Sequence, residues 1–163
     1  MRSPFLPFLL ATSALAVDKP KDLDLNAKLK TSATELSKLD LIHDQLVYDF
    51  NSHPYFTYSP GGVANANAAT FPAATGHGLT VAWLALGPCA MLPPHLHPRA
   101  TNFVVAVDGE TQTWMVQENG AKVVTTTLTP GKMTIFPQGS VHSMQNTGMS
   151  DPTPFPVATS RVR

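Results

Sequence analysis

The sequence predicts an all-β protein, an antiparallel sandwich or barrel, and two observations support that prediction. After residue 43 the chain runs through short apolar or alternating segments, each with the length of one β-strand. Glycine, proline, asparagine or aspartate separates them at intervals of about 8 to 12 residues, which is typical of such folds. The strand candidates are residues 46–50, 63–71, 79–86, 102–108, 111–118, 122–128, 132–136 and 141–146.

Composition indicates one domain. It argues against a protein that binds nucleic acid through a basic face and against one stabilised by an internal disulfide. The 163 residues, 43% of them hydrophobic, supply one packed core and leave little for a second domain. Lys plus Arg equals Asp plus Glu at 11 each, so no basic face for nucleic acid is expected. Cys89 is the only cysteine, which excludes a disulfide within the chain and leaves one unpaired thiol.

The first 16 residues predict a secretory signal peptide. Arg2 precedes an apolar run, and Ala14 and Ala16 have the A-x-A spacing of a signal peptidase site. A core or membrane helix is the alternative, but the run contains two prolines and is shorter than the roughly 20 residues that span a bilayer. We therefore expect a secreted, extracellular protein whose mature chain begins near Val17 and has no segment in a membrane.

Three further segments flank the strand-rich region. Residues 17–31 carry four of the chain's 11 basic residues in a short polar run, which predicts a solvated arm. Ser32 and Glu35 have the S-x-x-E spacing of a capping box, which predicts one short helix with leucines toward the core. Residues 149–163 contain three prolines, which lack the backbone donors of a paired central strand, so we expect an irregular tail.

Two histidines stand one residue apart in the stretch PPHLHPRATN, residues 93–102. Side chains alternate along an extended segment, so His95 and His97 leave the same face. Two imidazoles on one face have suitable geometry for a single metal ion, although such a pair taken alone is weak evidence.

A third histidine follows in the stretch GKMTIFPQGSVHSMQN, residues 131–146. Here a strand reaches Pro137, Gly139 occupies a turn, and His142 begins the next strand. A hairpin of this kind can direct His142 inward to His95 and His97. Three imidazoles from two strand pairs predict a site for one divalent metal ion that keeps open positions for water or substrate.

These two stretches resemble the two sequence boxes of the cupin superfamily, in particular its germin-like and spherulin-like members. The resemblance covers about residues 36–148, and we assign residues 32–148 to a cupin domain. It implies a jelly-roll barrel, or double-stranded β-helix, with a metal ion, often manganese, held inside on three His and one Glu. The matching residues are Gly87, His95, His97, Gly109, Gly131, Pro137, Gly139, His142 and Asn146.

The position of the family's glutamate holds Asn102 in this chain. Loss of the carboxylate removes about 4 kcal/mol of attraction at about 4 Å and an effective dielectric near 20, or nearly three decades of affinity. An amide oxygen can still bind a metal, but manganese would be held most weakly, and iron, copper or zinc become alternatives. The nearby acidic residues Asp108, Glu110 and Glu118 lie in predicted turns, so we expect solvated charges there.

Arg99, in the loop after the two histidines, is a candidate to bind substrate. Three His and one Asn leave the charge of a metal ion uncompensated, which favours a small anionic, carboxylate-bearing ligand that Arg99 could attract. The simpler interpretation of Arg99 is a surface salt-bridge partner. His77 is expected in a turn, and Asn146 is expected to bond turn backbone rather than metal.

Several functions remain open for such a protein. The resemblance implies a metal-dependent oxidoreductase or decarboxylase, such as an oxalate oxidase or decarboxylase, a dioxygenase, or a superoxide-dismutating enzyme. The sequence identifies no acid or base that favours one reaction, so whether the protein is an enzyme stays open. The alternatives are a non-catalytic structural or storage protein of the cell surface, and a cupin that binds carbohydrate or another small ligand without metal. In each case the resemblance suggests a homo-oligomer.

Overall fold

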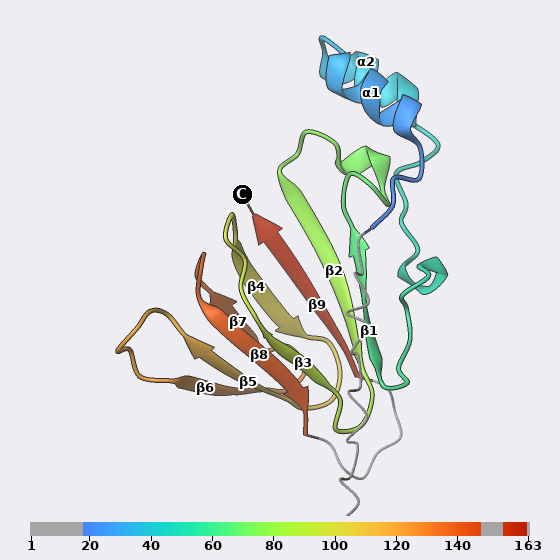
Figure 1. Ribbon diagram of the computed structural model, residues 1–163. Coiled ribbons are helices and arrows are strands. Elements are labelled where there is room, and N and C mark those ends of the chain that lie inside the picture. The colour runs from blue at the N-terminus through green and yellow to red at the C-terminus, as the bar shows by residue number, and fades with distance from the viewer. Residues whose placement is uncertain (1–17, 148–154, 163) are drawn as a thin grey trace, which may run out of the picture.

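The computed structural model describes residues 18–147 and 155–162, and it shows two antiparallel β-sheets with a pair of short helices beyond one end (Figure 1). The predicted leader, residues 1–16, lies outside the described residues. The elements are α1 (Leu23–Thr31), α2 (Glu35–Ile42), η1 (Phe50–Ser52), β1 (Gly61–Ala66), η2 (Pro72–Ala74), β2 (Leu79–Leu86), β3 (Met91–His95), β4 (Thr101–Ala106), β5 (Thr111–Val116), β6 (Val124–Leu128), β7 (Met133–Phe136), β8 (Val141–Asn146) and β9 (Phe155–Val162).

The strands form a five-stranded sheet in the order β1-β2-β9-β4-β7 and a four-stranded sheet in the order β3-β8-β5-β6. Every paired neighbour is antiparallel. The all-β prediction is therefore confirmed. Among the predicted strands, 79–86 and 141–146 match β2 and β8 residue for residue.

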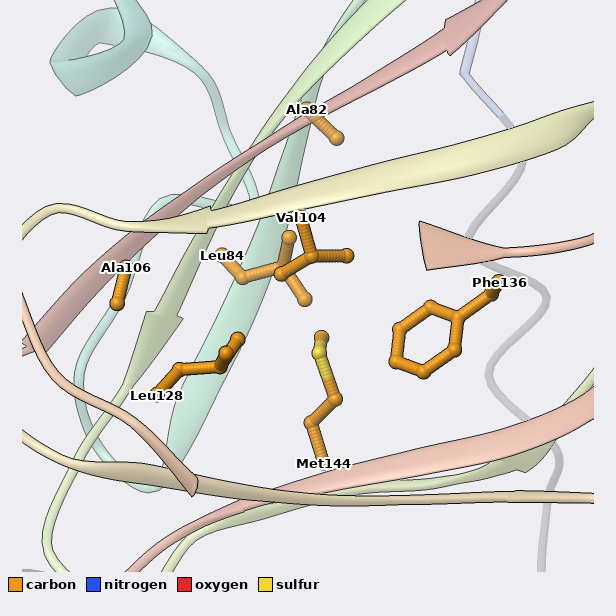
Figure 2. Close-up of a cluster of buried hydrophobic side chains, with 7 residues drawn as sticks. All are labelled: Ala82, Leu84, Val104, Ala106, Leu128, Phe136 and Met144. Carbon is orange, nitrogen blue, oxygen red and sulfur yellow. The ribbon is translucent and has the colours of Figure 1, made fainter. Parts of the chain in front are cut away.

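The core lies between the two sheets (Figure 2). Along β4, Val104 and Ala106 are fully buried while Val105 between them is partly exposed, which is the alternation expected of a strand with one face inside. Both sheets contribute to the same cluster, so the core packs the two sheets against each other. Its residues are Ala82, Leu84, Val104, Ala106, Leu128, Phe136 and Met144.

The prediction of an irregular tail is wrong for residues 155–162. These residues form β9, which pairs with β2 on one side and with β4 on the other. Pro156 is tolerated because it stands at the start of the strand, one residue before Val157, where pairing with β4 begins. The other two prolines of the predicted tail lie outside the described residues. Residues 155–162, which were not expected to form a strand, thus complete the five-stranded sheet.

The prediction of a solvated arm is wrong for residues 23–31, which form α1. The Asp22 side chain caps this helix by accepting a 2.8 Å hydrogen bond from the backbone N–H of Leu25. Leu25 and Leu29, four residues apart, are both buried and pack with Ile42 of α2. The lysines and aspartates around these two leucines made the segment look uniformly polar in the sequence.

The predicted helix exists as α2, but its cap and its buried face differ from the prediction. Thr34, not Ser32, is the N-cap and accepts from the backbone N–H of Ser37 at 3.1 Å. Ser32 instead ends α1, with its backbone N–H bonded to the carbonyl of Lys28. Leu36 is 69% exposed, so the predicted core-facing leucine lies in solvent.

Two strand assignments also differ from the prediction. Residues 46–50 are not a strand: the Asp49 side chain accepts from the backbone N–H of Asn51 at 2.9 Å and starts the short helix η1. Conversely, β3 includes Pro93 and Pro94, where we expected only an approach to the histidines. Because β3 is an edge strand of its sheet, these prolines remove no donor that an inner strand needs.

Candidate metal centre

Three histidines meet at one end of the four-stranded sheet. His95 ends β3 and is paired directly across the sheet with His142 of β8, while His97 follows two residues after His95. One ligand nitrogen from each histidine lies within 4.8 Å of the others. The ring centroids are separated by 4.4 Å for His95 and His142 and by 5.1 Å for His97 and His142. The structure therefore brings together all three predicted histidines.

Backbone carbonyls orient two of these rings. The Nδ1 of His95 lies 2.8 Å from the carbonyl oxygen of Pro93, and the Nδ1 of His142 lies 3.0 Å from that of Ser140. A carbonyl oxygen can only accept, so each Nδ1 carries the proton and donates it. Nε2 is then the basic nitrogen of each ring. Such a bond from the distal nitrogen is the usual way in which proteins orient histidine ligands.

The loop that carries His97 is tied to the turn that precedes β8 and His142. The backbone N–H of Gly139 donates to the carbonyl of His97 at 3.0 Å, and the Gln138 side chain donates to the carbonyl of Pro98 at 2.8 Å. Gly139 has a φ of 78°, a conformation that glycine adopts without strain. The hairpin turn before β8 thereby sets the position of the His97 loop.

Phe136 forms an apolar wall behind His142. The two rings stack with centroids 4.1 Å apart and an interplanar angle of 13°. Phe136 is 1% exposed and belongs to the core cluster, so His142 is held between the hydrophobic core and its Ser140 hydrogen bond. The stacking fixes the plane of the His142 ring and shields the ring face that contacts Phe136 from water.

Asn102 lies next to this wall, in β4 of the opposite sheet. It is paired with Phe136 across β4 and β7, and it faces inward with Val104 because the two are alternate residues of one strand. The residue is 3% exposed, and its Oδ1 makes no hydrogen bond within the described residues. A buried, unsatisfied amide oxygen is costly and is compatible with a metal ligand, so the residues present fit the predicted ion. Metal binding by Asn102 stays a prediction.

Arg99 lies in a surface groove near the same end of the molecule. The groove has a volume of about 510 Å³, and its lining includes Asn65, Thr80 and Arg99. Arg99 is exposed and belongs to none of the ion pairs among the described residues. Both the surface salt bridge and a role in substrate binding therefore stay predictions.

Other polar residues of the two boxes have structural roles. The carboxylates of Asp108, Glu110 and Glu118 are exposed in turns, as expected. Asn146 is fully buried and its side chain donates to the carbonyl of Leu86 at 3.0 Å, so it bonds backbone as predicted. His77 is exposed in the η2–β2 connection, outside the histidine cluster.

Sequence reasoning missed the residues that position the histidines. Pro93 and Ser140 supply the orienting carbonyls, and Gln138 ties the His97 loop to the turn before β8. Each orienting carbonyl belongs to the residue two positions before its histidine, a regularity that the structure alone shows. The sequence pattern does not reveal such backbone bonds, because they depend on the rotamer that packing selects.

A sequence profile of the family described as Cupin matches residues 50–160. The chain belongs to the cupin family. Its match extends through most of β9, and the two antiparallel sheets are those of a cupin jelly roll. This result confirms both the resemblance found in the two histidine boxes and the predicted fold class.

Curated relatives of this cupin include spherulins and germin-like proteins. Spherulin-1A of Physarum polycephalum is 37% identical over 122 residues, which make up 73% of this chain and 50% of the spherulin. Germin-like protein 1-1 of Oryza sativa subsp. japonica is 30% identical over 145 residues, or 85% of this chain and 67% of that protein. The cupin thus spans about half the length of the spherulins it matches.

Solved structures show the same fold. Peruvianin-I, described as a cysteine peptidase from Thevetia peruviana latex, has a TM-score of 0.64 and 27% identity over 72% of each chain. An oxalate oxidase has a TM-score of 0.57 and 24% identity, over 72% of this cupin and 56% of that chain. The second likeness concerns the fold alone. Within the described residues, none of the helices is long and apolar enough to cross a membrane.

Proposed function

We propose that this cupin holds one divalent metal ion on His95, His97 and His142, with the amide oxygen of Asn102 as a weaker fourth ligand. The observation that carries the proposal is the convergence of three imidazole nitrogens within 4.8 Å. The Nδ1 bonds of His95 and His142 support it, because they direct the basic Nε2 of each ring away from the backbone.

The neutral donor set bears on which metal is bound. Imidazole suits iron, copper and zinc, whereas manganese is bound most weakly in the divalent series and gains most from a carboxylate. No Asp or Glu joins the three histidines among the described residues. We therefore propose iron, copper or zinc before the manganese that the family resemblance suggests.

The proposed substrate is a small carboxylate, in an oxidase, decarboxylase or dioxygenase reaction. A bound ion would supply Lewis acidity and, if redox-active, electron transfer. The chain's own residues leave that site with excess positive charge, because three neutral imidazoles and an amide compensate none of it. Arg99 adds a positive charge to the nearby groove, whose lining also includes the carboxylate of Asp18. The excess positive charge at the ion therefore favours a ligand with one or two carboxylates.

A structural or storage role is the second candidate, and the same absence of a carboxylate favours it. Without a charged ligand the site loses about three decades of metal affinity relative to a glutamate-bearing one, by the estimate above. A protein with this site can keep the cupin scaffold, including its packed core, without catalytic turnover.

Elemental analysis of protein purified without added metal separates these candidates. About one divalent ion per chain is expected, and none in a folded His142→Ala variant. A wild-type site that is empty and stays empty on titration with zinc, copper, iron and manganese contradicts the metal proposal. Oxalate titration tests the substrate class, because binding that does not depend on metal contradicts an acid bound at the ion.

We also propose that the protein is exported and forms a homo-oligomer. The leader-like first 16 residues support export, which amino-terminal sequencing of protein from the culture medium tests. Exposed apolar residues on the outer face of β4 and β7, namely Val105, Met133 and Ile135, support self-association through that sheet. Light scattering coupled to gel filtration measures the oligomeric state, and a monomer contradicts this part of the proposal.

A further inference from the structure

A second pocket, separate in its residues from the histidine cluster, lies where the described chain begins. It has a volume of about 430 Å³, which is large enough for a small ligand and far larger than the roughly 30 Å³ of one water molecule. Residues of four segments surround it. They are Asp18, Lys19, Lys21, Tyr48, Ser52, His53, Pro54, Tyr55 and Thr70.

Asp18 is held rigidly in the wall of this pocket. Its Oδ2 accepts hydrogen bonds from the side-chain amides of Asn67 at 2.6 Å and Asn65 at 3.1 Å. The backbone N–H of Lys21 donates to the carbonyl of Ala69 at 2.8 Å and ties the same segment down. The carboxylate side chain is 12% exposed. These bonds fix the second oxygen, Oδ1, in place.

His53 presents a proton donor beside that oxygen. Its Nδ1 accepts a hydrogen bond from the backbone N–H of Tyr55 at 3.1 Å, so the ring proton must be on Nε2. Nε2 lies 3.6 Å from Asp18 Oδ1, which is too long for a hydrogen bond. Asp18 Oδ1 is buried and makes no hydrogen bond within the described residues. The acceptor Asp18 Oδ1 and the donor His53 Nε2 thus lie close together without forming a hydrogen bond to each other.

Only some ligand groups satisfy both atoms. A carboxylate can accept from Nε2–H, and Lys19 and Lys21 of the same lining would attract it, but it has no proton to donate to Asp18 Oδ1. An ammonium can donate to Asp18 but has no lone pair for Nε2–H. A hydroxyl both donates and accepts, so one hydroxyl can bridge the two atoms. The pair therefore selects a ligand that carries at least one hydroxyl group.

The remaining walls suit a ring with several hydroxyls. Tyr55 lies beside His53, with ring centroids 5.4 Å apart, and Tyr48 donates its hydroxyl to the carbonyl of Asn65 at 3.1 Å. Burial raises the pKa of Tyr48, so its hydroxyl stays neutral. Aromatic faces of this kind can pack against the C–H groups of a sugar, while Ser52 and Thr70 add hydroxyls to the lining.

We propose that this pocket binds a monosaccharide unit or similar polyol, with one ligand hydroxyl bridging Asp18 Oδ1 and His53 Nε2. This function goes beyond the metal site and uses none of its residues. The geometry that carries it is a buried acceptor and an oriented donor 3.6 Å apart in a cavity of about 430 Å³.

Ligand-observed NMR and calorimetry on the whole protein test this, with the methyl glycosides of glucose, mannose, galactose and xylose at millimolar concentration as probes. At least one is expected to bind the wild type. Asp18→Asn should weaken binding at least about tenfold. The amides of Asn65 and Asn67 require an oxygen at the Oδ2 position, so the new NH2 group replaces the acceptor at Oδ1.

Tyr55→Ala is the second variant, and it should weaken binding about tenfold. Tyr55 is 37% exposed, so its removal opens no internal cavity. Asp44→Asn, a matched change at an exposed aspartate, should bind as the wild type does. The proposal would be overturned by no binding of any of the four probes to wild-type protein, or by unchanged binding in both folded variants. Loss of binding on metal chelation would also overturn it, because the sugar would then occupy the metal centre.

Discussion

His142 and His53 are both buried histidines, yet the backbone gives them opposite chemistry. His142 Nδ1 faces the carbonyl of Ser140 and must donate, so its Nε2 is a basic nitrogen suited to a metal. His53 Nδ1 faces the N–H of Tyr55 and must accept, so its Nε2 is a proton donor suited to a hydroxyl. One backbone contact, made two residues away in each case, decides which function the same side chain can serve.

Their other neighbours reinforce this difference. His142 stacks on Phe136 of the hydrophobic core, which holds the ring without adding charge. His53 lies 3.6 Å from the carboxylate of Asp18, an acceptor that suits the proton on its Nε2. Buried histidines should therefore be interpreted from the partner of the distal nitrogen before a metal is assigned to them.

The largest expected effect is loss of the metal after His142→Ala. This change removes one of three histidine ligands. Changes to groups that only orient a ligand already lower metal affinity about 10- to 100-fold. We therefore expect affinity to fall by more than about 100-fold in calorimetric titration with zinc. His43→Ala removes an exposed histidine that pairs with Asp44 and should leave metal affinity unchanged. Wild-type zinc affinity in a folded His142→Ala protein would show that His142 is not a metal ligand, and the contrast with His53 would fail.

A large gain is expected from Asn102→Glu. A carboxylate restores the missing charge, and by the same Coulomb estimate manganese affinity should rise by up to about a thousandfold. Asn102→Gln, which lengthens the side chain without charge, is the control and should give no such rise. Manganese titration followed by electron paramagnetic resonance measures both. Equal manganese affinities in the two variants would show that residue 102 does not face the ion.

A moderate effect is expected from Phe136→Leu. The core loses part of a ring that is 1% exposed, which should cost about 1 to 2 kcal/mol in urea unfolding of the metal-free protein. Metal affinity should also fall about tenfold, because His142 loses its stacking partner. Met144→Leu, in the same core cluster but without a ring contact to the histidine, should leave metal affinity unchanged. Parallel losses of affinity in both variants would contradict an orienting role of Phe136.

The smallest effect is expected at Glu35, whose exposed ion pair with Lys38 contrasts with the buried contact between Asp18 and His53. The hydrogen bond from Lys38 lowers the pKa of Glu35 below its ordinary 4.5. A lowered pKa adds stability above pH 4.5 and loses it as the pH falls through the lowered value. Because the Glu35 side chain is 75% exposed, Glu35→Gln should scarcely change urea unfolding at neutral pH. A clear loss of stability would show that this surface pair matters more than its exposure implies.

Local patterns predicted much of the fold and all three histidines of the cluster. Alternation and turn residues identified β2 and β8 residue for residue, and the two-residue spacing of His95 and His97 indicated one face. The same reasoning failed at β9, where prolines argued against a central strand. It also failed at α1, where two buried leucines stood among charges. In both segments the deciding contacts are with distant parts of the chain, which no local pattern contains.

By itself the sequence determined the residue types and spacings of the candidate metal centre, because strand alternation and turn chemistry act over a few neighbouring residues. Only the tertiary structure decided which side chains and strands far apart in the sequence contact each other. Asp18 meets Asn65 and Asn67 across 47 and 49 residues, and β9 enters between β2 and β4. Such contacts form only when packing and hydrogen bonding outweigh the entropy of closing long loops, and that balance belongs to the whole fold.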